Sequence, residues 1–377
     1  VECNQVRSIF QLEIMMNSTT RLFGLALLIL SFGGILAGCS GRQAMLSRAS
    51  IPTFFSDEIK KEIKGVTKTV VSINSNIKYE IQKFHYERVN GRFVPDPRSH
   101  LRYKLANNGV NGTTVETEDK TLSGGGLILN FEPVASRYII LTSNHLVAPQ
   151  DTTDIYYLDE YGQNTDVLFA RYIVKNVDIL VRGDSNWRAE AKLIISEEIE
   201  DLAIIESQTN NLLGVEFHNR VGFDLDLGWG DWVFLFGFPK GVKQISGGWV
   251  SESPYPSTLT VDAVVRFGFS GGPVFALAGD PAKLDFVGVI KSVPRSTLDF
   301  IAPAVAWPMG YGLAPEDISD LVVKKEIMVE YGTAYFVSPK TLQRFFNTNR
   351  NAIERAGVRL PPKYYGEKEP ARLPGQN

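Results

Sequence analysis

A glycine-rich hexapeptide surrounds one serine in this chain: Gly268-Phe269-Ser270-Gly271-Gly272-Pro273. A serine hydroxyl becomes an effective nucleophile only when a base removes its proton and N–H groups stabilise the oxyanion that forms. Glycines on both sides permit a tight turn that exposes the hydroxyl and aims backbone N–H groups inward. The hexapeptide therefore indicates acyl-transfer chemistry on Ser270, against the alternative of a glycine-rich turn with an incidental serine.

The chain offers four histidines as a base for this serine: His85, His100, His145 and His218. In the α/β-hydrolase elbow G-x-S-x-G, which the hexapeptide also fits, the histidine follows the serine. No histidine follows His218, so the sequence excludes that scaffold. His145 comes just after the apolar run 138–141, and the end of a strand is a rigid place from which to present an imidazole. The other three histidines stand in polar segments, which indicates surface positions.

A carboxylate is needed to orient the imidazole and to stabilise its charged form. Asp201 leads directly into the apolar run Leu202-Ala203-Ile204-Ile205, where a carboxylate is costly to bury unless it is hydrogen-bonded. The chain order His145, Asp201, Ser270 is that of the chymotrypsin-type arrangement. We therefore expect these three side chains to converge.

The elements that must position these residues are short apolar segments bounded by glycine and proline, which are typical of an all-β barrel or sandwich. Residues 58–81 indicate a short helix followed by a strand, and residues 86–120 indicate a long surface loop. A terminal helix begins after Ser338-Pro339 and ends near Gly357. The tail from Leu360 is rich in proline, and we expect it to be disordered.

Composition limits the classes of function that remain. The 377 residues are 44% apolar, as in a packed globular protein, and their formal net charge of −3 provides no basic field for nucleic acid. With only Cys3 and Cys39, a disulfide framework and a thiolate metal site are excluded. No phosphate-binding loop, H-E-x-x-H motif or dinucleotide fingerprint occurs, so we expect no metal and no cofactor.

The N-terminus has the pattern of an export signal. Arg21 precedes an uncharged stretch, residues 22–37, which is shorter than the roughly 20 residues that span a bilayer. Its end, Leu36-Ala37-Gly38-Cys39, resembles the bacterial lipobox, against the alternative of a buried helix with an incidental cysteine. The resemblance implies cleavage after residue 38, lipid on Cys39 and a protein anchored in the cell envelope facing the periplasm. Ser40 favours the outer membrane because it is not the aspartate associated with inner-membrane retention.

Taken together, the segments resemble the trypsin-like serine protease family, and specifically its HtrA/DegP-type bacterial branch. The similarity covers roughly residues 60–345 in unbroken order. The matching segments are 123–128, 140–147, 191–193 with 201–205, 230–233 with 237–241 and 248–251, 262–263 with 268–273, and 332–335.

The resemblance implies two perpendicular antiparallel β-barrels with a C-terminal helix and a site in the cleft between them. Ser270 would be the nucleophile, His145 the general base and acid, and Asp201 its orienter, while the N–H groups of Gly268 and Ser270 would form the oxyanion hole. The substrate would be polypeptide. The implied organisation is a signal segment 1–38, a tether 39–58, a first barrel 59–215, a second barrel 216–345 and a C-terminal part 346–377.

Several features depart from the family pattern. Phe269 stands where the family has a small polar residue, and Arg266-Phe267 replaces an Asn-Pro type pair, so the oxyanion turn is open to reshaping. Little chain follows the last matched strand, so we expect no PDZ domain. A catalytically inactive binding or scaffold lipoprotein, and an esterase or other acyl transferase, stay open as alternatives.

The alignment also implies a substrate pocket lined by Val264, Lys291 and Val293. Its apolar walls favour a small aliphatic side chain over a basic one, because an unpaired buried charge is costly. Lys291 does not fit that preference. The oligomeric state, the physiological substrate and the activation trigger are left open by the sequence.

Overall fold

The computed structural model describes residues 56–367 except residues 108, 110–111, 160–162, 185–186, 209–214, 216, 279–282 and 304–320. The export signal, Cys39, most of the expected tether and the last ten residues of the tail lie outside the described residues. No helix in the described part is both long enough and apolar enough to cross a membrane.

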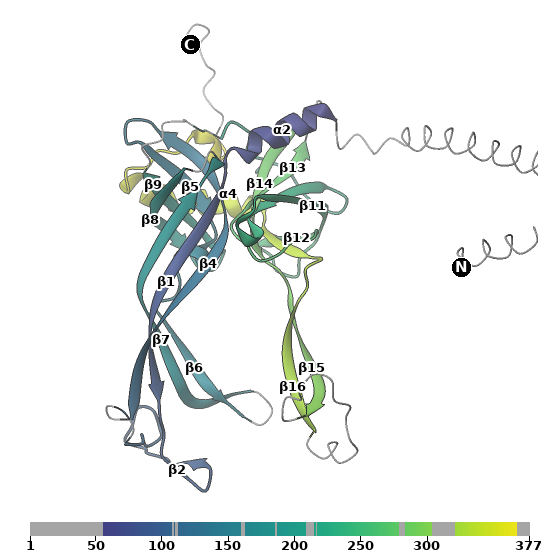
Figure 1. The fold of residues 1–377 in the computed structure, drawn as a ribbon. Coiled ribbons are helices and arrows are strands. Elements are labelled where there is room, and N and C mark those ends of the chain that lie inside the picture. Colours follow the sequence, from purple (N-terminus) through teal and green to yellow (C-terminus); the bar gives the residue numbers. More distant parts are fainter. Residues whose placement is uncertain are drawn as a thin grey trace, which may run out of the picture. The chain divides into compact units, whose positions relative to one another are not determined.

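Six antiparallel strands close the first barrel, in the order β1-β4-β5-β9-β8-β7 and back to β1 (Figure 1). The helix α2 (Asp57–Thr67) precedes this barrel, and the one-turn helix α3 (Asn144–Val147) follows β5. The barrel strands are β1 (Val70–Phe84), β4 (Thr113–Glu132), β5 (Arg137–Thr142), β7 (Asn164–Arg182), β8 (Arg188–Glu197) and β9 (Leu202–Gln208).

The second barrel is closed by six strands in the order β10-β11-β12-β17-β14-β13. They are β10 (Trp232–Gly237), β11 (Gln244–Ser251), β12 (Thr258–Asp262), β13 (Pro273–Ala278), β14 (Lys283–Ser292) and β17 (Ala334–Val337). The turn η3 (Pro239–Gly241) follows β10, and β15 (Arg295–Pro303) pairs with β16 (Leu321–Val329) as a separate hairpin.

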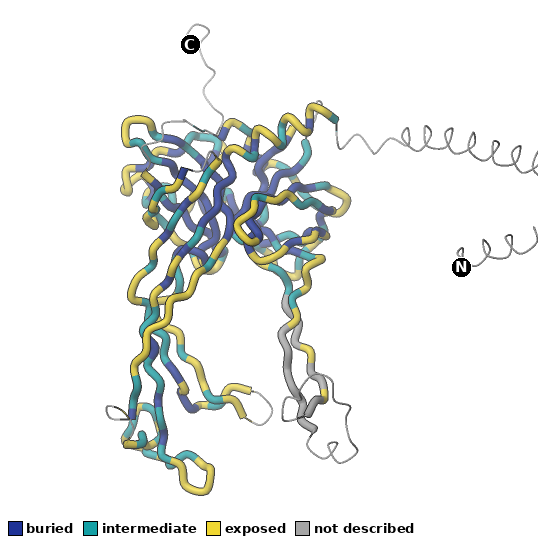
Figure 2. Tube along the Cα trace, in the orientation of Figure 1, coloured by how far each residue is buried: buried dark blue, intermediate teal, exposed yellow. Residues whose placement is uncertain are grey.

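Burial explains why these segments form strands. The apolar side chains of Ile128, Ile140 and Ile205 are fully buried and lie at paired positions on neighbouring strands of the first barrel. Buried residues gather in the barrels, whereas the outer half of β4 is largely exposed and the outer halves of β1 and β7 are only partly buried (Figure 2). The prediction of an all-β fold with two antiparallel barrels and a C-terminal helix is confirmed.

The C-terminal helix α4 (Pro339–Arg355) begins where the sequence predicts. The Ser338 hydroxyl accepts a hydrogen bond from the Thr341 N–H, and proline occupies the first turn, where its missing N–H costs nothing. Phe346 and Ile353 on the buried face of α4 are fully buried, and η5 (Pro362–Tyr365) packs beside this helix. Gly357 has a φ of +74°, as a glycine that ends a helix commonly does.

The segment 86–120 differs from the expected surface loop. It forms the small hairpin of β2 (Arg88–Val89) and β3 (Arg92–Phe93), and from Thr113 onward it is strand, because residues 113–127 of β4 pair with the whole of β1. On the other edge of this extension, β6 (Thr152–Leu158) pairs with β7. A satellite cluster of apolar side chains supports the extension: Phe84, Tyr86, Phe93, Tyr103 and Tyr157.

Candidate active site

Asp201 holds His145 by two hydrogen bonds. The Asp201 Oδ1 accepts from the His145 backbone N–H at 2.8 Å, and Oδ2 lies 2.8 Å from the ring Nδ1. An ionised carboxylate only accepts hydrogen bonds, so Nδ1 carries the proton and Nε2 keeps its lone pair free. The Asp201 side chain is 11% exposed and the His145 side chain 44%, which buries the orienting group and leaves the imidazole accessible.

The backbone at Asp201 is left-handed, with a φ of +58°. Aspartate tolerates this conformation better than most residues. The turn is fixed on both sides, because the Asp201 N–H donates to Glu198 and the Asp201 carbonyl accepts from the Asn144 N–H at 3.1 Å. The strand β9 begins at the next residue, so a buried strand anchors the carboxylate.

Ser270 lies in a turn that is hydrogen-bonded to strands of both barrels. The Ser270 carbonyl accepts a hydrogen bond of 2.8 Å from the Gly125 N–H in β4, and the Gly271 N–H donates to Ile290 in β14. The Ser143 hydroxyl, two residues before His145, donates to the same Ile290 carbonyl at 3.2 Å. These contacts bring the serine of the second barrel beside the histidine of the first.

The turn that precedes Ser270 leaves two N–H groups available. The Phe269 N–H donates to the Arg266 carbonyl at 3.1 Å and Gly268 has a φ of +105°, as in a type II turn with glycine at its third position. Within the described ranges, neither the Gly268 nor the Ser270 N–H donates a hydrogen bond to the protein. A Cβ at Gly268 would lie 2.6 Å from the Phe238 carbonyl oxygen, so only glycine fits here.

The Phe269 side chain points away from the side of the turn where the Gly268 and Ser270 N–H groups are available. Its side chain is 3% exposed and packs among the apolar residues of the second barrel. Gly237 makes the room, because a Cβ there would lie 2.5 Å from the Phe269 ring. The large side chain of Phe269, which departs from the family pattern, therefore packs in the core of the second barrel. Phe267 is instead 63% exposed, and its ring contacts Tyr331 edge-on.

One cavity of about 940 Å³ is lined by His145, Asp201, Gly268 and Ser270 together. Lys291 and Val293 also line it, whereas Val264 does not and is 63% exposed. In the described part of the chain, the Ser270 hydroxyl makes no hydrogen bond with the His145 ring. Such contacts are commonly long in unliganded sites and tighten when substrate binds.

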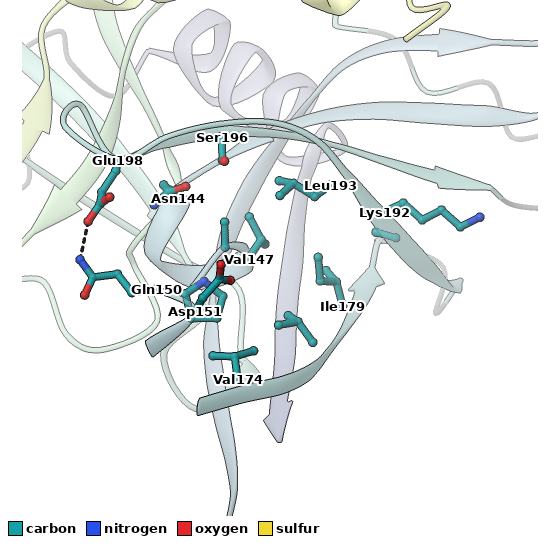
Figure 3. Close-up of a pocket in the computed structure, with 14 residues that line it drawn as sticks. Asn144, Val147, Gln150, Asp151, Val174, Ile179, Lys192, Leu193, Ser196 and Glu198 are labelled. Carbon is teal, nitrogen blue, oxygen red and sulfur yellow. Dashed lines mark hydrogen bonds between the residues drawn. The ribbon is translucent and has the colours of Figure 1, made fainter. Parts of the chain in front are cut away.

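A second cavity of about 730 Å³ adjoins the first on the surface of the first barrel (Figure 3). The two cavities share Asn144, Gln150 and Glu198, and the Gln150 side-chain amide donates to Glu198 at 2.6 Å. Valine, isoleucine and leucine side chains of β7 and β8 form its other wall, as Figure 3 shows for Val174 and Leu193.

Contacts that the sequence did not reveal hold the loop before Asp201. Lys291 Nζ donates to the Ile199 carbonyl at 2.8 Å, and the Arg344 guanidinium of α4 bonds to Glu200. Both cations belong to the second barrel or the C-terminal helix, far away in sequence, so no local pattern indicated them. Among the described residues, no three metal-binding side chains cluster where they could hold an ion.

Comparison with known proteins agrees with this geometry. Residues 126–282 match the family model of the trypsin-like peptidase domain, and this range contains His145, Asp201 and Ser270. Residues 126–282 therefore form a trypsin-like peptidase domain. The resemblance to the trypsin-like family that the ordered motifs predicted is confirmed.

Two relatives of this chain share one description. A probable periplasmic serine endoprotease DegP-like of Pseudomonas fulva is 24% identical over 221 residues, which cover 55% of this chain and 38% of that protein. The protein of that description in Brucella suis is 28% identical over 152 residues, which cover 33% of this chain and 29% of that protein. The chain thus spans about a third of the length of these curated relatives.

Among solved structures, an HtrA-type protease, AlgW with decapeptide, is similar with a TM-score of 0.41 and 16% identity. The similarity covers 78% of this chain and 68% of that chain.

Proposed function

We propose that this protein is a serine endopeptidase that hydrolyses peptide bonds through an acyl-enzyme on Ser270. The observation that carries the proposal is the double hydrogen bond from Asp201 to His145, in a cavity that also contains Ser270 and its two unused N–H groups. The match to the trypsin-like peptidase domain supports the same reaction class.

The proposed reaction follows from the proton positions. His145 Nε2 accepts the proton of the Ser270 hydroxyl as its oxygen attacks the scissile carbonyl carbon, and Asp201 stabilises the imidazolium that forms. The N–H groups of Gly268 and Ser270 stabilise the oxyanion of the tetrahedral intermediate. The intermediate collapses when His145 returns the proton to the leaving amine. Water activated by the same imidazole then hydrolyses the acyl-enzyme.

A fluorophosphonate probe tests this proposal, because it reacts only with a serine that is activated in this way. We expect labelling of Ser270 in the wild-type protein and none in Ser270→Ala or His145→Ala. Ser292→Ala is the matched control, because Ser292 lines the same cavity and has no role in the proposed chemistry. A folded wild-type protein that resists the probe would contradict the proposal.

A catalytically inactive binding protein is the second candidate function. It is favoured by the missing hydrogen bond between Ser270 and His145 in the described part of the chain. This candidate predicts that polypeptides bind to the cavity without being cleaved. Binding of a labelled peptide to the wild-type protein, with the peptide recovered intact, would favour it over the peptidase. An esterase predicts instead that simple esters are turned over while peptides are not.

We further propose that the protein is anchored through lipid on Cys39 and faces the periplasm. The uncharged stretch 22–37 and the lipobox-like Leu36-Ala37-Gly38-Cys39 support this location, and the relatives are described as periplasmic. Labelling of growing bacteria with a radioactive fatty acid should mark the wild-type protein but not Cys39→Ala. Recovery of unlabelled wild-type protein in the soluble periplasmic fraction would refute the anchor.

A further inference from the structure

Three cationic side chains line the cavity that contains Ser270. Lys240 lies in the turn η3, Arg266 lies four residues before Ser270, and Lys291 lies in β14. We name this set the cationic wall. All three residues belong to the second barrel, and none of them forms a salt bridge with any residue that the structure describes.

The carboxylates of the same cavity are already engaged. Asp201 is occupied by its two hydrogen bonds to His145, and Glu198 accepts from the Gln150 amide on the side of the first barrel. The chain as a whole has a net charge of −3, so the positive charge of the cationic wall is opposite in sign to the charge of the whole chain. The adjoining cavity has the opposite balance, because Asp151 and Glu198 line it with Lys192.

Lys240 occupies a costly backbone conformation. Its φ is +53°, a left-handed value that lysine rarely adopts and glycine adopts freely. The turn is fixed by the Gly241 N–H, which donates to the Phe238 carbonyl at 2.9 Å, and Phe238 itself donates to the Gly268 carbonyl at 2.7 Å. A lysine in this position therefore has its backbone tied to the turn that precedes Ser270.

Lys291 has a fixed ammonium group. One of its three N–H donors bonds to the Ile199 carbonyl at 2.8 Å, and the residue is only partly exposed. Two donors remain for an anion in the cavity. Arg266 is exposed beside them and adds a planar guanidinium, which binds a carboxylate through two parallel hydrogen bonds.

We propose that the cationic wall selects polypeptide substrates with an aspartate or glutamate side chain next to the scissile bond. This inference rests on the proposed endopeptidase function and specifies its substrate class. It also accounts for Lys291, which conflicts with a pocket for aliphatic side chains. Phe267 and Val293 line the same cavity and contact the aliphatic part of the substrate side chain.

The test compares three peptides that differ at one position next to the scissile bond: glutamate, glutamine or lysine. Each exposed ion pair contributes a factor of about three, so two pairs give roughly tenfold higher kcat/KM for glutamate than for lysine. The preference should shrink at high salt, because salt screens exposed charges.

Variants separate the cationic wall from general charge effects. Arg266→Gln and Lys291→Gln should each reduce the preference for glutamate several-fold, and Arg266→Glu should favour the lysine peptide. Lys283→Gln is the matched control, because Lys283 is exposed in the same barrel and does not line the cavity. Equal rates for the three peptides in the wild-type protein would overturn the proposal.

A binding measurement distinguishes failure of this proposal from failure of the proposed function. Fluorescence anisotropy of the three labelled peptides is measured with Ser270→Ala, which cannot cleave them. If the wild-type protein cleaves no peptide but Ser270→Ala binds the glutamate peptide most tightly, the proposed role of the cationic wall is supported and the proposed endopeptidase function is refuted. Equal affinities for the three peptides would refute the cationic wall whether or not cleavage occurs.

Discussion

Replacement of Asp201 by asparagine tests the proton positions at the site. One asparagine oxygen still accepts from the His145 backbone N–H, but an amide nitrogen now faces the ring in place of Oδ2. That nitrogen donates, so the imidazole must present Nδ1 as an acceptor and carry its proton on Nε2. The imidazole then has no lone pair for the Ser270 proton.

The expected loss follows from this change of tautomer. The same substitution in chymotrypsin-type enzymes lowers kcat by about 10⁴. The cost in stability is smaller, about 1–2 kcal/mol, because one charge-assisted hydrogen bond becomes neutral. Asparagine also tolerates the φ of +58° at this position, so the turn is retained.

The assay measures the rate constant for labelling of Ser270 by a fluorophosphonate, with urea unfolding measured in parallel. Asp178→Asn makes the same chemical change at an exposed position of β7 outside the cavity, and it should leave both quantities unaltered. If Asp201→Asn is labelled at the wild-type rate, the assignment of Nε2 as the base is refuted. If it unfolds at the wild-type urea concentration while labelling is lost, only the stability estimate fails.

Three further predictions concern the turn, the core and the extension. Gly268→Ala should lower the labelling rate by about 10²–10³, because the added Cβ displaces an N–H donor of the proposed oxyanion hole. Gly230 also has a positive φ but has open space around it, so Gly230→Ala should leave the labelling rate unchanged. Equal labelling rates for the two variants would contradict the prediction. Phe269→Ala should cost about 3–5 kcal/mol in urea unfolding and Phe269→Leu less than about 1.5, and equal losses would contradict tight packing of this ring. Burial raises the pKa of Tyr86 to about 12, so the stability that it contributes is complete below pH 10 and is lost as the pH rises toward 12. The free energy of unfolding, measured in urea, should therefore fall between pH 9 and pH 11 by about 1 kcal/mol more in the wild-type protein than in Tyr86→Phe. Equal losses of free energy in the two proteins would refute this.

Local patterns in the sequence predicted the barrels well. The run that follows Asp201 and the run that precedes His145 are both buried strands, and a strand that is buried on both faces is recognisable in the sequence as a continuous apolar run. The order of these motifs also led us to expect one shared site, and the structure brings His145, Asp201 and Ser270 to one cavity. Their catalytic roles, and the domain boundaries drawn from the sequence, stay predictions.

The long strands β4 and β7 were harder to predict than β1, which the sequence indicates as a strand up to residue 81. The outer half of β4 is largely exposed and that of β7 mixes exposed and buried residues, so no strict alternation marks them as strands. Their support comes from aromatic residues that lie far apart in the chain, such as Phe93 and Tyr157, whose rings are 5.1 Å apart. A contact between such distant residues leaves no local signature.

Packing across the second barrel explains why Phe269 was misleading. Its size suggested a reshaped oxyanion turn, because a glycine-rich turn has little space for a phenylalanine. The space is provided by Gly237 on another strand, and a sequence alone does not reveal which glycine faces which ring. The placement of Lys291 against Ile199 is hidden for the same reason.

The hydrogen bond from the Gly125 N–H to the Ser270 carbonyl couples the proposed nucleophile to the other barrel. A sliding motion between the barrels would carry the serine backbone along with the strand neighbouring the one that leads to His145. The distance between the Ser270 hydroxyl oxygen and the His145 ring therefore changes little during such motion. Substrates that force the barrels apart would have to break this bond before they could misalign the reacting groups.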